Sequence, residues 1–136
     1  MKSESNLILI LIITCAGIVL SCKTGQDASN QSSVQITAQD SGKVVTLGLR
    51  QSLKITLANP GDGGYTFDTL QYNSALLSLA SHVHTPPTTN AMGNFGTDTW
   101  VFSALKTGST GLKVTATRGT DKNSTVTMFN GTIAVN

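Results

Sequence analysis

The 136-residue sequence has few cysteines, few acidic residues and little charge of either sign. Its two cysteines, Cys15 and Cys22, lie near the N-terminus, so the rest of the chain has no thiol for a disulfide, a thiolate metal site or a nucleophile. Glu4 is the one glutamate, and the remaining acidic residues are scattered aspartates. Few groups are therefore left for a mechanism that needs paired carboxylates or a glutamate base.

Charged residues make up only 12% of the chain, and the formal net charge is +2. The basic residues are scattered, so the positive field is too weak to favour nucleic acid, and we expect no nucleic-acid partner. Hydrophobic residues make up 39%, which is enough for one globular core, and the length fits a single domain. We expect a monomer.

The N-terminus has the layout of a secretory signal peptide. Lys2 lies in a short polar start, and residues 7–20 form a run dominated by Leu and Ile that ends before Ser21. A bilayer-spanning helix needs about 20 apolar residues, so this shorter run fits export better than a permanent span.

The segment Val19-Leu20-Ser21-Cys22 resembles the lipobox of bacterial lipoproteins, in which the cysteine is acylated and becomes the new N-terminus. The resemblance implies cleavage after residue 21 and attachment to a membrane through lipid on Cys22. Lys23 follows in place of Asp, which by the same resemblance favours the outer membrane or periplasmic face of the cell envelope over the inner membrane. An ordinary cleaved signal or an uncleaved anchor is the alternative.

The rest of the chain divides into a tether and a β-rich domain. Residues 22–33 have hardly an apolar side chain and predict a flexible tether, which leaves residues 34–136 as the domain. About a quarter of the residues from Cys22 onward are Thr, Val or Ile, and such residues favour strands. The fold class is therefore predicted to be all-β.

Alternation of apolar and polar residues locates the strands, as at Leu53, Ile55 and Leu57. Seven to eight short antiparallel strands predict a β-sandwich, because a single open sheet would expose one apolar face to water. In one segment, Leu76–Leu79, a short helical turn is an alternative. The predicted strands are 34–38, 44–49, 52–57, 65–71, 76–82, 99–104, 112–117 and 125–135.

Three patterns could indicate an enzyme, and none is complete. His82 and His84 share one strand face, with Ala80 if no bulge intervenes, but there is no third His or thiolate for a metal, so a solvated strand face is predicted. No serine lies in a Gly-x-Ser-x-Gly elbow, and the glycine-rich residues 61–64 lack the lysine of a phosphate loop. We expect neither an enzyme nor a bound metal or cofactor.

Three stretches in order resemble the chagasin family of cysteine peptidase inhibitors. Residues 57–67, Leu-Ala-Asn-Pro-Gly-Asp-Gly-Gly-Tyr-Thr-Phe, are similar to the family's Asn-Pro-Thr-Thr-Gly-Tyr-x-Trp segment. Residues 92–108 resemble its Gly-x-Gly-Gly loop, the strand that follows and a Lys-x-Gly turn. Arg118 falls where its Arg-Pro-Trp loop would begin. The ordered series covers most of residues 44–136 and is more specific than any one motif.

The resemblance implies an immunoglobulin-like β-sandwich whose three loops at one end occlude the cleft of a papain-like cysteine peptidase, reversibly and without covalent chemistry. This peptidase would be the partner. The inhibitory loop residues implied by the resemblance are Asn59, Pro60, Gly61, Asp62, Gly63, Gly64, Gly93, Asn94, Phe95, Gly96 and Arg118.

The loops also depart from the family pattern. Gly61 and Asp62 replace two threonines, Phe95 replaces a glycine, and Gly119 and Thr120 replace Pro and Trp. A non-inhibitory binding or structural module of the cell envelope on the same fold is therefore the alternative function. Metal analysis would test the remaining, enzymatic hypothesis.

Individual loop side chains keep alternatives as well. Phe95 is our candidate anchor in the cleft, and an inward position over the end of the sandwich is its alternative. Arg118 is either a contact residue or a charge that solvates a strand end. Asp62 would either bond to the catalytic imidazolium or repel the thiolate. Tyr65 and Phe67 are expected in the core.

Overall fold

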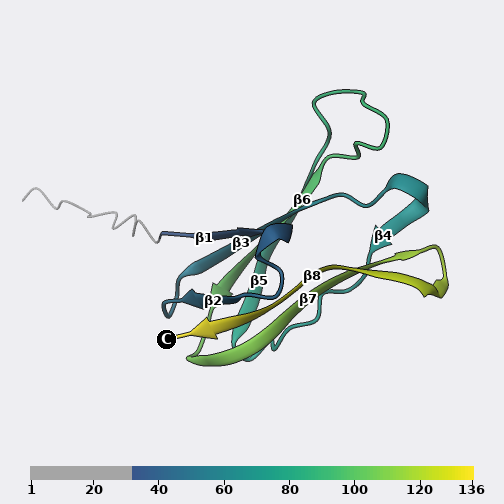
Figure 1. Cartoon of the computed structure of the whole chain (residues 1–136). Coiled ribbons are helices and arrows are strands. Elements are labelled where there is room, and N and C mark those ends of the chain that lie inside the picture. Colours follow the sequence, from purple (N-terminus) through teal and green to yellow (C-terminus); the bar gives the residue numbers. More distant parts are fainter. Residues whose placement is uncertain (1–31) are drawn as a thin grey trace, which may run out of the picture.

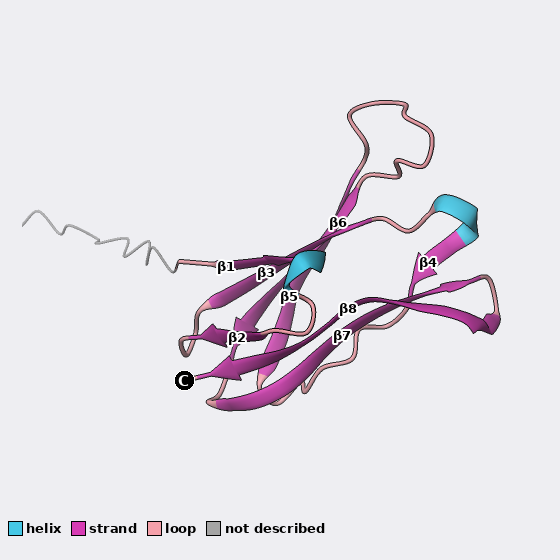
Figure 2. Cartoon of the chain, in the orientation of Figure 1, coloured by secondary structure: helices cyan, strands magenta, loops and turns pink. Residues whose placement is uncertain are grey.

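The computed structural model describes residues 32–136, which form two four-stranded sheets packed face to face (Figures 1 and 2). The strand order is β1-β3-β6-β5 in one sheet and β2-β8-β7-β4 in the other. In chain order the elements are β1 (Val34–Thr37), the 3-10 turn η1 (Ala38–Asp40), β2 (Val44–Leu47), β3 (Ser52–Ala58), the 3-10 turn η2 (Asp62–Gly64), β4 (Tyr65–Phe67), β5 (Leu77–Thr85), β6 (Thr97–Ala104), β7 (Gly108–Arg118) and β8 (Asp121–Val135). The predicted all-β sandwich is confirmed.

Two edge pairings differ from the predicted antiparallel arrangement. β1 runs parallel to β3, and β2 runs parallel to β8, whereas the other neighbours are antiparallel. β1 and β2 are joined by the turn η1 but belong to different sheets. Each of these short strands therefore lies at the edge of its own sheet and does not pair with the other.

The core lies between the sheets and is built from alternate residues of the central strands. Leu53, Ile55 and Leu57 of β3 are buried, as their alternation predicted. Trp100 of β6 packs edge-to-face on Phe67 of β4, with ring centroids 4.8 Å apart, and so links the two sheets. Each such buried side chain contributes about 1.5 to 3 kcal/mol of transfer free energy.

Several strands end elsewhere than predicted. β4 stops at Phe67, although the next residue, Asp68, still donates its amide to the Thr115 carbonyl and accepts hydrogen bonds from the hydroxyls of Thr115 and Thr117. β5 begins at Leu77 and continues to Thr85, so Leu77–Leu79 are strand, and a single turn precedes them in which the amides of Leu76 and Leu77 donate to the Asn73 carbonyl. The hairpin of β7 and β8 is longer than predicted. The residues that extend it are mainly polar residues and glycines, so they pair as strands without the apolar alternation that identifies a strand in the sequence.

The predicted signal peptide (1–21), the lipidation site Cys22 and most of the predicted tether lie outside the described residues. Among residues 32–136, no helix has the length and apolar character needed to cross a membrane.

Candidate functional site

Three connections meet at the end of the sandwich that lies away from the C-terminus (Figure 1). Loop 1 (residues 59–64) joins β3 to β4, loop 2 (residues 86–96) joins β5 to β6, and loop 3 (residues 118–121) is the turn of the β7–β8 hairpin. β3 and β5 both pair antiparallel with β6, so both end where β6 begins. Strand topology therefore brings loops 1 and 2 to the same end.

Loop 1 is a tight turn that glycine makes possible. The side-chain oxygen of Asn59 accepts a hydrogen bond from the Gly61 amide at 2.9 Å, and the Gly64 amide donates to the Gly61 carbonyl at 3.2 Å. Gly63 and Gly64 have φ angles of 69° and 79°, a left-handed conformation in which side chains are disfavoured. The loop therefore presents mainly backbone at its tip.

Loop 2 carries the most exposed apolar side chains of this end. Met92 is fully exposed and Phe95 is 43% exposed. The side chain of Asn94 accepts a hydrogen bond from the Gly96 amide, which closes the turn. Gly96 is required by space as well as by its φ of 83°, since a Cβ there would lie 2.1 Å from the carbonyl oxygen of Thr85.

Loops 1 and 2 are in direct contact. The Asn59 amide donates to the Gly96 carbonyl at 2.9 Å. The Phe95 ring covers Gly61 so closely that a Cβ on Gly61 would lie 2.9 Å from the ring. Two departures from the family pattern, the glycine at 61 and the phenylalanine at 95, therefore fit each other.

Arg118 connects loop 3 to loop 1. Its Nε donates to the Gly63 carbonyl, and its guanidinium lies 5.7 Å from the centroid of the Tyr65 ring. Tyr65 is the register partner of Arg118 and is only half-buried, so it belongs to this surface rather than to the deep core. Arg118 is thus a structural tie between two loops, and its side chain remains exposed.

The structure brings the sequence-predicted loop residues together at one end of the molecule. Asp62, Asn94 and Arg118, one from each loop region, are all exposed there. A Cβ on Gly93 would lie 3.6 Å from the carboxylate of Asp62, which is a further approach of loop 2 to loop 1. Loop 1 therefore contacts both of the other loops, loop 2 through the hydrogen bond between Asn59 and Gly96 and loop 3 through the hydrogen bond between Gly63 and Arg118.

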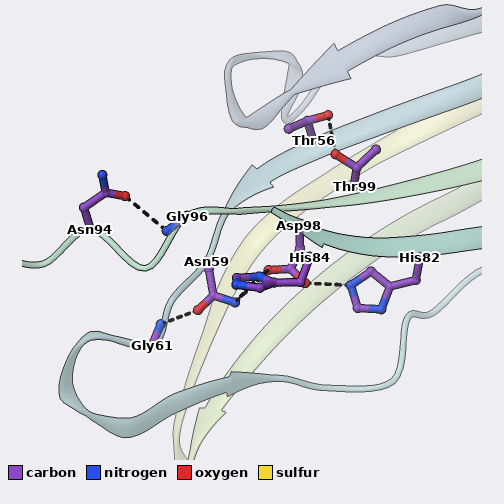
Figure 3. Close-up of polar contacts among 9 residues, drawn as sticks. All are labelled: Thr56, Asn59, Gly61, His82, His84, Asn94, Gly96, Asp98 and Thr99. Atoms are coloured by element: carbon purple, nitrogen blue, oxygen red, sulfur yellow. Dashed lines mark hydrogen bonds and ion pairs between the residues drawn. The ribbon is translucent and has the colours of Figure 1, made fainter. Parts of the chain in front are cut away.

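The sequence analysis missed Asp98, which lies beneath this surface and is only 3% exposed (Figure 3). It sits at the start of β6 and faces His84 on β5. Its carboxylate accepts hydrogen bonds from Asn59 Nδ2 at 2.6 Å, His82 Nε2 at 2.7 Å and His84 Nδ1 at 3.0 Å.

These contacts overturn the expectation that the two histidines line a merely solvated strand face. The imidazoles are a little under half exposed, and both reach Asp98. A bulge between Leu79 and Ser81 shifts the register of β5, and the ring of His82 stacks on Trp100 at 4.6 Å. Among residues 32–136 there is no group of three His, Cys, Asp or Glu arranged to hold a metal ion.

Burial raises the pKa of the Asp98 carboxyl, but the hydrogen bonds from Asn59, His84 and His82 outweigh it, and the pKa lies below its usual value. Asp98 is therefore an ionised acceptor at neutral pH. One sequence signal could have identified Asp98. It is an acidic residue at the start of a strand, at a position that the alternation assigns to the core face.

Comparisons with known proteins agree with the fold and identify a family. The model of the chagasin family of peptidase inhibitors, I42, matches residues 46–133. A cysteine protease inhibitor of Entamoeba histolytica, EhICP2, has a similar structure, with a TM-score of 0.64, 15% identity, and coverage of 76% of this chain and 95% of that one. Amebosin is also similar, with a TM-score of 0.50, 16% identity, and coverage of 76% and 97%. No curated protein sequence matches the chain.

Proposed function

Because the chain belongs to the chagasin family of peptidase inhibitors, we propose that it inhibits papain-like cysteine peptidases reversibly, by occluding the substrate cleft with loops 1, 2 and 3. The observation that carries the proposal is the hydrogen-bonded junction of the three loops. Asn59 ties loop 1 to loop 2, and Arg118 ties loop 3 to loop 1. Such a preformed surface loses little conformational entropy on binding.

The chemistry of the surface suits occlusion rather than reaction with the peptidase. Glycines in loop 1 allow backbone to approach the walls of a cleft closely. Met92 and Phe95 supply exposed apolar side chains, the kind of group that anchors an interface when it is desolvated. The cysteine peptidase as target is further supported by the fold shared with the Entamoeba inhibitor.

The test is a titration of papain with the purified full-length protein in mild detergent, under reducing conditions, with trypsin as the control. We expect reversible inhibition of papain that competes with substrate, and no effect on trypsin. If a micromolar concentration of folded protein leaves papain turnover unchanged, the inhibitory proposal fails. The alternative, a non-inhibitory module of the cell envelope, would then be preferred.

We also propose that the protein is a lipoprotein of the bacterial envelope, anchored through Cys22 at the outer membrane or periplasmic face. The support is the lipobox-like segment that precedes Cys22. Cys22→Ala should abolish incorporation of radiolabelled palmitate and shift the protein from the membrane fraction. Palmitate labelling that persists in this variant would contradict the proposal.

A further inference from the structure

A buried carboxylate lies directly below loops 1 and 2, although neither loop contains it. Asp98 is the second residue of β6 and is 3% exposed, whereas its neighbours Thr97 and Thr99 are half-buried. A buried carboxylate is costly unless donors surround it, and here three side chains donate to it. Packing alone therefore does not explain why the Asp98 carboxylate is buried here.

One of the three donors belongs to loop 1. Asn59 donates its side-chain amide to Asp98 and accepts the Gly61 amide with its side-chain oxygen (Figure 3). An amide turned the other way would point its oxygen at the carboxylate and its NH₂ group at the Gly61 amide, and both contacts would become repulsive. Asp98 therefore fixes the orientation of the side chain that closes loop 1.

The same residue also joins the two loops. The backbone amide of Asn59 donates to the Gly96 carbonyl at the end of loop 2. Gly96 lies two residues before Asp98 in the chain. Asn59 of loop 1 is therefore bonded to both ends of this short segment, to Gly96 through its backbone and to Asp98 through its side chain, and these contacts form a closed circuit. The circuit sets how far loop 1 stands from loop 2.

The two histidines complete the surroundings of Asp98. His82 and His84 of β5 are the titratable groups that face it, and within residues 32–136 no lysine or arginine forms an ion pair with it. Each imidazole donates through one nitrogen, and that nitrogen carries a proton in the imidazolium as well as in one neutral tautomer. Because an ionised carboxylate can only accept, both imidazoles donate to Asp98, and protonation of Asp98 would remove the acceptor.

We propose that Asp98 is the positioning residue of the inhibitory end: through Asn59 it fixes the shape of loop 1 and its distance from loop 2. The effect on inhibition rests on the proposed function, whereas the effect on loop 1 does not. Asp98 itself is covered by the histidines and makes no contact with the peptidase in this proposal.

The test exchanges the two partners in the purified full-length protein. Asn59→Asp places two carboxylates against each other, so we expect loop 1 to move and papain inhibition to weaken about tenfold or more. The double variant Asn59→Asp/Asp98→Asn restores one donor and one acceptor in the reverse order. We expect it to recover inhibition to within about threefold of the wild type.

Hydrogen exchange of the Gly61 amide, followed by NMR, reports on loop 1 without any peptidase. We expect its protection to fall about tenfold or more in Asn59→Asp and to return in the double variant. In the wild type, protection should be present at pH 7 and should be lost only as pH falls through the pKa of Asp98, which lies below the usual value of a carboxyl group. Loss of protection between pH 7 and 5 would overturn the proposal.

Asp68→Asn is the matched control. Asp68 is a carboxylate that, like Asp98, is held by side-chain donors, although it is only half-buried, and those donors, Thr115 and Thr117, lie outside loops 1 and 2. This variant should lower stability and leave Gly61 protection unchanged.

The possible failures are distinguishable. If the wild type does not inhibit papain, the proposed function fails, and Gly61 exchange still decides the role of Asp98. If the wild type inhibits papain, two results would show that the positioning role is wrong. Either Asn59→Asp loses neither inhibition nor Gly61 protection, or the double variant recovers neither of them. A single variant that fails to fold does not prevent a decision, because the double variant retains the hydrogen bond.

Discussion

Phe95 is half-covered in the free protein and is the side chain proposed to enter the peptidase cleft. Its ring covers Gly61 and still leaves 43% of the residue exposed. Both alternatives considered from the sequence, inward and exposed, are therefore partly realised. A half-covered aromatic side chain is already ordered, so its burial by a peptidase would gain apolar area at a small cost in side-chain entropy.

Phe95→Ala should weaken the binding of papain by about 1 to 3 kcal/mol, because it removes a desolvated anchor. The inhibition constant measures this change. Leu105→Ala is the matched control, since Leu105 is 54% exposed in the turn between β6 and β7 at the opposite end. Equal inhibition constants for Phe95→Ala and the wild type would show that the ring does not enter the cleft.

Asp98 also predicts how stability depends on pH. Its pKa is lower in the folded protein than the ordinary value, so the unfolded state binds more protons as pH falls. Its contribution to stability is therefore present above about pH 4 and lost as pH falls through the folded pKa. Asp98→Asn should lower the free energy of unfolding at pH 5, and its difference from the wild type should shrink towards pH 2. Chemical denaturation at both pH values measures this, and a constant difference would contradict it.

At the scale of elements, loops 1 and 2 depart from the family pattern at two positions that lie against each other. Gly61 has a φ of −57°, so its backbone would accept threonine, and the obstacles to a Cβ are the Phe95 ring at 2.9 Å and the side-chain oxygen of Asn59 at 3.0 Å. The family pattern has the reverse arrangement, with a threonine in the first loop and a glycine in the second. The Phe95 ring of loop 2 therefore occupies space that a side chain at position 61 of loop 1 would need.

Gly61→Thr should displace the Phe95 ring and destabilise the protein, whereas the same change combined with Phe95→Gly should have room for the new side chain. We expect a favourable coupling free energy of about 0.5 to 3 kcal/mol between the two substitutions. Urea unfolding of the wild type, the two single variants and the double variant gives this value. Additive effects would show that the two departures are independent.

The strands that alternate strictly could be predicted from the sequence, and those that do not could not. Leu53, Ile55 and Leu57 have a clear period of two, because one face of β3 is buried and the other is partly solvated. In β5 the bulge after Leu79 breaks this period, so the alternation could not show which face of the strand carries His82. Asp98 was missed because its partners come from β5 and loop 1, and only the fold brings them together.

At the scale of the whole molecule, the three loops lie at one end of the sandwich, whereas the core extends between the sheets along its length. The loops are held by local hydrogen bonds among Asn59, Gly96 and Arg118, and by Asp98 below them. β2 and the end of β8 lie at the other end, beside the C-terminus (Figure 1). A core substitution far from the loops should therefore lower stability without changing inhibition.

Leu47→Ala tests this separation. Leu47 is fully buried in β2 and pairs with Val135, at the end away from the loops. Removing its side chain leaves a cavity, so we expect the free energy of unfolding to fall by about 2 to 5 kcal/mol. The inhibition constant for papain, measured at a temperature where the variant is still folded by circular dichroism, should match that of the wild type, because no contact between the loops involves β2. An inhibition constant that worsens along with stability would mean that the loops depend on the packing of the entire sandwich, and the local circuit through Asp98 would then be insufficient to hold them.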